Sequence, residues 1–349
     1  MTEILAVTCP GGNQCSYLLP LLYEKSKFKL RLAARSQSSV SRLKSTYPNA
    51  EVKQIDLVSP DACRWLVQGA TAVYHVGPPP HCQEKEIGFN MIDAAVAEMY
   101  RPGNTFRHFV YSSVLGTQSC DLMLQDHRSR VEKHLFLSPL NYTILQPSNF
   151  MDAYSVQNLV QQKIPIMKSA WDPLIRKSLV ALHDLAEAAV IVLNEREKHF
   201  YARYPLCSTL PVSDFDIAYL ISKHTGTLIE VQSLTFAETV EDILKSPYGG
   251  ESSDLYVAYE LPSYFEYASR GDDTRPDLCR EDALVLILFY LTRGFKGNPS
   301  VLRWLLGREP TTVDDYVKLE LEKAGLSSQF NCHTGTWSLR SICRWFLGY

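Results

Sequence analysis

The sequence lacks three features that would each direct it to a different class of protein. No apolar run is long enough for a bilayer, because the longest, Ala283 to Leu291, has nine residues and a spanning helix needs about 20. A basic excess is also missing, since the formal net charge is -3, so nucleic-acid binding is not expected. We therefore expect no integral membrane span, a buried helix at the apolar run, and a small-molecule ligand.

Paired cysteines are the third missing feature. The nine cysteines are odd in number and scattered, and none forms a C-x-x-C pair. A disulfide framework or a zinc site would need clustered, evenly paired thiols. The first residues show no charged segment followed by a long apolar stretch, so no signal peptide is expected. A reducing, cytoplasmic location and the absence of a metal are the resulting expectations.

Short apolar runs alternate with helix-like segments over the first 150 residues. This alternation predicts a doubly wound parallel sheet, with strands buried on both faces. The expected fold is α/β, a Rossmann-type sheet followed by a smaller, mainly helical region on the substrate side. The expected domains are residues 1–150, 151–325 and a tail, 326–349. The predicted strands of the first domain are 4–9, 29–34, 51–55, 72–76, 108–112 and 142–145.

Capping signals mark two later helices. Ser213 and Gly226 are predicted to begin and end one of them, and a capping box at Thr311 to Asp314 begins another that closes at Gly325. Asp184, next to His183, is interpreted as a helix N-cap.

The turn after the first predicted strand reads Cys9-Pro-Gly-Gly-Asn-Gln-Cys15. Such a turn binds a dinucleotide pyrophosphate, because backbone N–H groups and a helix N-terminus supply positive potential. A G-x-x-G-x-x-G arrangement places glycine at 9, 12 and 15, and only Gly12 is present. Cys9 fits poorly if its position needs a positive φ, and Pro10 removes one donor. A dinucleotide site is predicted, and an ordinary strand-to-helix turn is the alternative.

Residues after the next strands extend this prediction. An acidic residue after the second strand would bind the ribose of NAD, whereas Arg35 stands there and suits the 2′-phosphate of NADP. Asp56, after the third strand, could accept from the adenine amino group, and Gly77, after the fourth, would allow close approach of a ribose. The alternatives are a solvated arginine and a plain turn residue.

With these residues the chain resembles the NmrA-like family of atypical short-chain dehydrogenases/reductases, in its fungal form. The resemblance covers roughly residues 3–325 and rests on Gly12-Asn13-Gln14, Arg35, Asp56, Val131 to Asp152 and Gly294 to Thr312. It implies a Rossmann-type NADP(H)-binding domain, in which Gly12, Asn13 and Gln14 would bind the cofactor, with a smaller substrate-side domain. Some members are reductases and others are nucleotide sensors that regulate partner proteins. Fungal members often belong to specialised-metabolite biosynthesis.

The helix expected to flank the reaction site departs from the pattern of that superfamily. Its members usually carry a tyrosine and, four residues on, a lysine, and these positions hold Leu124 and Arg128. Leucine cannot transfer a proton, and arginine keeps its own, so Arg128 could clamp a ribose or an oxyanion without acting as an acid. The replacement candidates are His127, Ser113 and Asp152, each with a structural alternative such as a surface histidine or a satisfied turn.

Two further polar residues are interpreted as structural. His75, at the end of the fourth strand, is expected to be buried in the core. Glu132 is expected on a solvated helix face.

Three functions stay open from the sequence. An NADP(H)-dependent oxidoreductase acting on a small organic metabolite is favoured narrowly, because Arg35 and the fold support it. A non-redox isomerase or cyclase would explain the lost glycines. An NADP-sensing regulator would bind a protein partner, for which the aromatic segment Trp337 to Tyr349 is a candidate, although packing of that segment on the domain is expected. A dimer is also left open.

Overall fold

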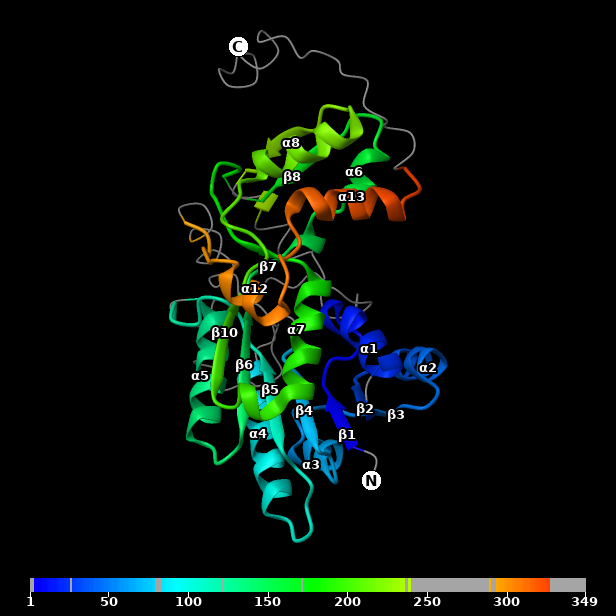
Figure 1. Ribbon diagram of the computed structural model, residues 1–349, viewed down its shortest axis with the longest axis vertical. Coiled ribbons are helices and arrows are strands. Elements are labelled where there is room, and N and C mark those ends of the chain that lie inside the picture. Colours follow the sequence, from blue (N-terminus) through cyan, green and yellow to red (C-terminus); the bar gives the residue numbers. More distant parts are fainter. Residues whose placement is uncertain are drawn as a thin grey trace.

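The computed structural model describes residues 3–25, 27–78, 83–120, 122–170, 172–235, 238–239, 289 and 293–326. Its larger lobe is built on a seven-stranded parallel sheet with strand order β10-β6-β5-β4-β1-β2-β3 (Figure 1). The order changes direction between β1 and β4, which opens a crevice at the carboxyl ends of these strands. The strands are β1 (Glu3–Val7), β2 (Phe28–Ala34), β3 (Glu51–Gln54), β4 (Ala72–Val76), β5 (His108–Ser112), β6 (Tyr142–Pro147) and β10 (Ala202–Leu206).

Helices cover both faces of the sheet, which is why its strands are apolar on both sides. Successive residues of a strand point to opposite faces, so Leu5 and Val7 join a core with α1, α2, α7 and α12, whereas Ala6 joins one with α3, α4 and α5. The predicted doubly wound fold is therefore confirmed. The helices are α1 (Asn13–Lys25), α2 (Gln37–Thr46), α3 (Pro60–Val67), α4 (Glu84–Tyr100), α5 (Met123–Leu137), α7 (Leu182–Glu195) and α12 (Ser300–Leu306).

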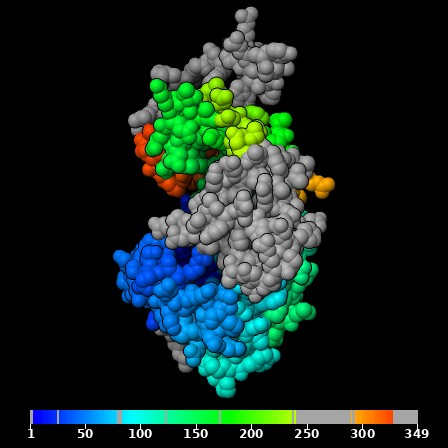
Figure 2. Space-filling model, turned by 180° about the vertical axis from the view of Figure 1, so that it is seen from behind, coloured from blue at the N-terminus to red at the C-terminus, as the bar shows by residue number. Residues whose placement is uncertain are grey.

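A smaller lobe lies above the carboxyl edge of the sheet (Figure 1), and the view from behind shows the same two-lobed shape (Figure 2). Its own core joins residues of α6, α8 and α13 around Met151 and Ile221. Two short parallel pairs, β7 with β9 and β8 with β11, complete it. Its elements are β7 (Asn149–Phe150), η1 (Met151–Ala153), α6 (Val156–Val160), β8 (Ile166–Ser169), β9 (Leu179–Val180), α8 (Asp214–Thr225), β11 (Glu230–Ser233) and α13 (Val313–Lys323).

The chain does not divide between the lobes in simple sequence order. After building β7 to β9 of the smaller lobe it returns to the sheet, where α7 packs on α1 and β10 pairs with β6. A turn of 3-10 helix, η2 (Arg196–His199), joins these two elements. The prediction did not include this return, because parallel pairing of β10 with β6 leaves no local signal.

Local capping signals are largely confirmed. Ser213 caps α8 in a reciprocal capping box with Asp216, and Gly226 ends that helix at φ +66°. The second capping box is centred one residue later than expected, since Thr312 and Asp315 form it.

The interpretation of Asp184 as an N-cap is wrong. Ala181 occupies the N-cap of α7, and Asp184 lies in the first turn, fully buried. Its carboxylate accepts hydrogen bonds from Ser208 Oγ at 2.8 Å and from the Thr311 N–H at 2.8 Å. Partners distant in sequence, and not the helix end, therefore satisfy it.

Two expectations fall on parts of the chain that the structure does not describe. The apolar run from Ala283 to Leu291, apart from Phe289, and the aromatic segment from Trp337 to Tyr349 lie outside the described residues. Within the described ranges, no helix has the length and apolar character that a membrane crossing requires.

Candidate functional site

The glycine turn keeps its backbone geometry although glycine is missing from its first position. Cys9 lies at φ +47°, in the left-handed region that L residues rarely adopt, at a cost of roughly 1–2 kcal/mol. The Gly12 N–H donates to the Cys9 carbonyl at 3.0 Å and closes the turn. The expected conflict between Cys9 and a positive φ is thus confirmed, and the turn tolerates it.

Neither thiol of the turn brings a negative charge to it. Cys15 is buried in the core between β1 and α1, where its Sγ donates to the Thr8 carbonyl at 3.8 Å, and burial raises the pKa of this thiol. Burial also raises the pKa of Cys9 to about 12. The first turn of α1 carries no acidic residue. The turn therefore keeps the positive potential that a pyrophosphate requires.

Two arginines lie near the glycine turn and the end of β2. Arg35 is exposed directly after the strand, and a Cβ placed on Gly11 would lie 3.1 Å from Nη2 of Arg42, so the Arg42 side chain reaches the glycine turn from α2. Ser36 caps α2, whose first turn has no acidic residue. Two cations beside an uncrowded helix N-terminus fit a 2′-phosphate. The sequence analysis did not predict a role for Arg42, although this second arginine lies only seven residues after Arg35, in the helix that follows.

Asp56 and Gly77 have structural partners of their own. The Asp56 carboxylate accepts from the Val58 N–H at 3.0 Å, which is an ordinary turn bond. A Cβ on Gly77 would lie 2.2 Å from Oε1 of Glu84, so the missing side chain makes room for that carboxylate. The contacts of adenine with Asp56 and of a ribose with Gly77 stay predictions.

Arg128 is fixed by a buried ion pair. Its Nε lies 2.8 Å from Oε1 of Glu84, the first residue of α4, and the two side chains are 13% and 1% exposed. Its Nη1 donates to the Ser113 carbonyl at 2.9 Å. Burial raises the pKa of Glu84, and Arg128 opposes that shift. The guanidinium thus stands at the edge of the sheet, fully ionised. Glu84 was missed, because nothing in its local sequence marks it.

Ser113 turns its hydroxyl away from the crevice. It donates to Oε1 of Glu132 at 2.6 Å, and the Gln146 amide nitrogen donates to the same oxygen at 2.8 Å. Glu132 is buried, so its interpretation as part of a solvated helix face is wrong. The reason is that the polar ends of β5 and β6 supply it with donors. The Ser113 hydroxyl contributes to this buried network.

Gln14 is held above the ends of two strands. Its Oε1 accepts from the Ser112 hydroxyl at 2.8 Å and from the Tyr74 hydroxyl at 3.3 Å. Ser112 ends β5 and Tyr74 lies in β4, and both are buried. This is a tertiary arrangement that the turn motif alone does not reveal.

The remaining candidate acids among the described residues make no hydrogen bond or ion pair with Arg128. His127 is half-buried on α5 and has no hydrogen bond to a described residue, and burial lowers its pKa. Asp152 accepts from the Tyr17 hydroxyl at 2.9 Å, which links the two lobes, and burial raises its pKa. His75 is buried as expected, with Nδ1 3.1 Å from the Thr8 hydroxyl. The structure brings together Gln14, Arg128 and the Ser113 carbonyl at the crevice.

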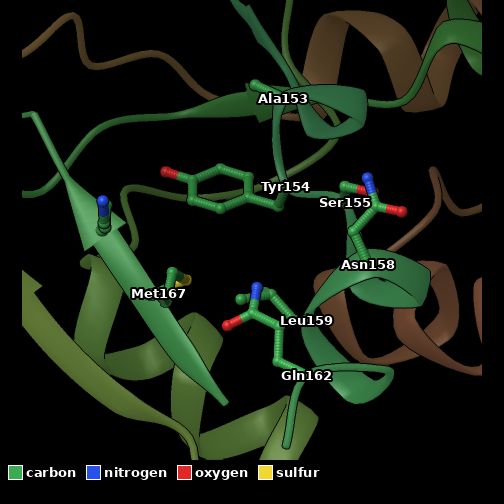
Figure 3. Close-up of a pocket in the computed structure, with 8 residues that line it drawn as sticks. Ala153, Tyr154, Ser155, Asn158, Leu159, Gln162 and Met167 are labelled. Carbon is green, nitrogen blue, oxygen red and sulfur yellow. The ribbon is translucent and has the colours of Figure 1, made fainter. Parts of the chain in front are cut away.

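A shallow cavity of about 210 Å³ opens on the smaller lobe, between α6 and β8 (Figure 3). The Tyr154 ring forms one wall, and its hydroxyl donates to Oδ1 of Asp214 at 2.7 Å, beside Lys177 Nζ at 2.7 Å from the same oxygen. The lining residues are Ala153, Tyr154, Ser155, Asn158, Leu159, Gln162, Met167 and Lys168. None of them belongs to the crevice. Among the described residues, no group of three metal-ligating side chains comes together.

Solved structures with the same fold include two reductases and a regulator. Triphenylmethane reductase from Citrobacter sp., complexed with NADP(H), is 18% identical over 91% of this chain and 100% of its own, with a TM-score of 0.67. An NADPH-dependent quinone oxidoreductase from Escherichia coli is 21% identical over 91% of this chain and 99% of its own, with a TM-score of 0.65. NmrA, a negative transcriptional regulator in complex with NAD, is 15% identical over 93% and 99%, with a TM-score of 0.65.

The TM-scores of these structures show a common fold, a Rossmann-like α/β sheet. No protein of curated function matches the chain. A family model described as NAD(P)H-binding matches residues 11–196, which is more than half of the chain and contains Arg35, Arg128 and the part of the glycine turn from Gly11 onward. The chain therefore belongs to the NAD(P)H-binding family.

Proposed function

We propose that this protein is an NADP(H)-dependent oxidoreductase that acts on a small organic metabolite. The observation that carries the proposal is the pair Arg35 and Arg42 beside the acid-free N-terminus of α2, where a carboxylate would favour NAD. When bound, the reduced cofactor supplies the hydride.

This chain supplies the binding groups. Gly12, Asn13 and the N-terminus of α1 would hold the pyrophosphate, and Arg35 with Arg42 would hold the 2′-phosphate. Arg128, fixed by Glu84, would bind a ribose hydroxyl or a developing oxyanion. Asp56 and Gly77 would contact the adenosine half.

Among the described residues of the crevice, the lack of a free proton donor restricts the hydride acceptor. Leu124 stands at the tyrosine position, Arg128 cannot release its proton, and the Ser113 hydroxyl is bound to Glu132. An acceptor such as a quinone or a delocalised cation needs no protein acid in the hydride step, since its charge is spread or neutralised. The similarity of fold to a quinone oxidoreductase and to triphenylmethane reductase supports this choice.

The biological setting follows from the resemblance to the NmrA-like family. We propose a cytoplasmic enzyme of fungal specialised-metabolite biosynthesis. The scattered cysteines support a reducing compartment. Those in the described part of the chain are free thiols: Cys9, Cys15, Cys63, Cys120 and Cys207.

An NADP-sensing regulator is the second candidate, favoured by the fold shared with NmrA and because the described residues of the crevice include no free acid. Binding without oxidation across a panel of acceptors would favour it. The isomerase or cyclase hypothesis loses its main support, because the turn keeps its left-handed residue at Cys9 without glycine.

Titration with NADPH and NADH, followed by tryptophan fluorescence, tests the proposal. Arg35→Ala removes a charge-assisted contact to the 2′-phosphate and should weaken NADPH about tenfold or more. NADH, which lacks that phosphate, should change little. The matched control is Lys44→Ala, which removes an exposed cation from the last turn of α2. Equal losses for both nucleotides, or no binding by the unmodified protein, would contradict the proposal.

A further inference from the structure

Gln14 places a carboxamide over the carboxyl ends of β4 and β5. It lies in the first turn of α1, and its Oε1 accepts from two buried hydroxyls, Ser112 at 2.8 Å and Tyr74 at 3.3 Å. These bonds join three elements that are far apart in the sequence, because Gln14 and Ser112 are 98 residues apart.

In the structure the carboxamide of Gln14 faces the two hydroxyls with its oxygen. Each has a proton to donate, and an amide oxygen can accept two hydrogen bonds. The amide nitrogen with its two N–H donors must then lie on the other side. No described residue accepts from this nitrogen, and the Gln14 side chain is half-buried. The N–H donors therefore face the open edge of the sheet.

The Ser113 hydroxyl and two nitrogens of Arg128 at this edge have partners within the protein. The Ser113 hydroxyl binds Glu132, and Arg128 binds Glu84 and the Ser113 carbonyl. Ligands of open α/β sheets bind at this edge. We propose that Gln14 is a catalytic residue, which donates a hydrogen bond to the carbonyl oxygen of a quinone-type acceptor. This inference rests on the proposed function and names the substrate class of the same site.

The chemistry balances without a protein acid. Bound NADPH would supply the hydride, whose C–H bond breaks as NADP⁺ forms. The hydride would bond to a ring carbon of the quinone, and the electron pair of the conjugated carbonyl would move onto oxygen. One proton from water would neutralise that oxygen, and tautomerisation would move the added hydrogen from carbon to the other oxygen, which gives the hydroquinone. A donor that is fixed before the charge develops stabilises the transition state. A neutral amide can do this without giving up a proton.

Two variants of the full chain separate this role from cofactor binding. Gln14→Leu removes the amide at similar volume, and Gln14→Glu keeps the shape without the N–H donors. Single-turnover oxidation of bound NADPH by 1,4-naphthoquinone should slow about 10²-fold in both. The dissociation constant of NADPH, read from nicotinamide fluorescence, should stay within about threefold for Gln14→Leu. Ser112→Ala should give an intermediate rate, because the carboxamide loses one of its two anchors.

Glu24→Gln, at the exposed end of α1, is the control and should leave both quantities unchanged. Unchanged rates in both Gln14 variants overturn the inference, and so does a loss of NADPH affinity for Gln14→Leu that matches the loss of rate. A protein that binds NADPH but does not reduce naphthoquinone overturns the substrate class and leaves the cofactor site standing. A protein that binds no NADPH overturns the proposed function as well.

Discussion

Cys9 has the backbone conformation of a glycine but carries a side chain. Its φ of +47° is held by the turn, in which the Gly12 N–H binds the Cys9 carbonyl at 3.0 Å. The strain in this turn is a property of the Cβ and not of the thiol. The two contributions can be separated by substitution.

Cys9→Gly should raise the free energy of unfolding by about 0.5–1 kcal/mol. Relief of the left-handed conformation gains roughly 1–2 kcal/mol, and the larger entropy of an unfolded glycine removes about 0.5–1 kcal/mol of that. Urea denaturation measures the difference. Cys9→Ala keeps the Cβ and should give no gain. A gain of equal size in Cys9→Ala would show that the thiol, and not φ, causes the strain.

Single residues also show where the sequence stops being informative. Arg35 could be singled out because the role proposed for it depends on its place after a strand. Glu84 and Glu132 could not, because their partners are brought to them by the tertiary fold. The Glu84 to Arg128 pair joins residues 44 apart, and Glu132 is satisfied from β5 and β6. Local sequence describes neither contact.

At the scale of elements, α7 shows how a local rule fails. An aspartate near a helix start usually caps it, but Asp184 lies within the first turn and binds Ser208, Thr311 and Arg308. These contacts fasten the segment between α12 and α13 to α7. The capping boxes of α8 and α13, by contrast, involve residues three apart in the sequence and were predicted nearly in place.

Asp184→Ala should lower the free energy of unfolding by about 3 kcal/mol, because it removes a fully buried carboxylate and leaves buried donors without a partner. Glu187→Ala is the matched control. Glu187 binds the same Arg308 but is 42% exposed, so its loss should cost about 0–1 kcal/mol. Urea denaturation compares the two. Equal effects would mean that Arg308, and not the buried carboxylate, is what fastens the segment.

At the scale of the whole molecule, the parallel sheet could be predicted, but the addition of β10 at its edge could not. Continuous apolar strands alternating with helices are sufficient to indicate a doubly wound sheet. The return of the chain through α7 to β10 depends on long-range pairing with β6. The lobes are linked by contacts between residues far apart in sequence, such as Tyr17 with Asp152 and Asp184 with Thr311. The lobe arrangement is therefore a product of tertiary contacts.

Two histidines in the central strands make the stability of the whole molecule depend on pH. His75 in β4 and His108 in β5 are buried, and burial lowers the pKa of each to about 3, with Arg128 adding to the effect at His75 and Arg196 at His108. In the unfolded chain a histidine titrates near pH 6.5. The unfolded state therefore binds more protons than the folded state between about pH 6.5 and pH 3.

The contribution of these two histidines to stability is therefore fully present above about pH 6.5. As the pH falls from there toward 3, the free energy of unfolding decreases by about 1.4 kcal/mol per pH unit for each histidine. Together the two predict a slope of about 2.7 kcal/mol per unit near pH 5, measurable by urea denaturation from pH 7 to 4.5. Asp314 titrates below this range, because hydrogen bonds from Lys318, His224 and Lys223 outweigh burial and lower its pKa. Burial raises the pKa of Glu84 and Asp152, which opposes the slope, and lowers the pKa of His127 and His199, which adds to it. His75→Gln should therefore lower the slope by about 1.4 kcal/mol per pH unit, whatever its own stability. If the slope did not change, or if the His75 ring titrated above pH 5 in NMR spectra of the folded protein, buried neutral histidines would not be the cause.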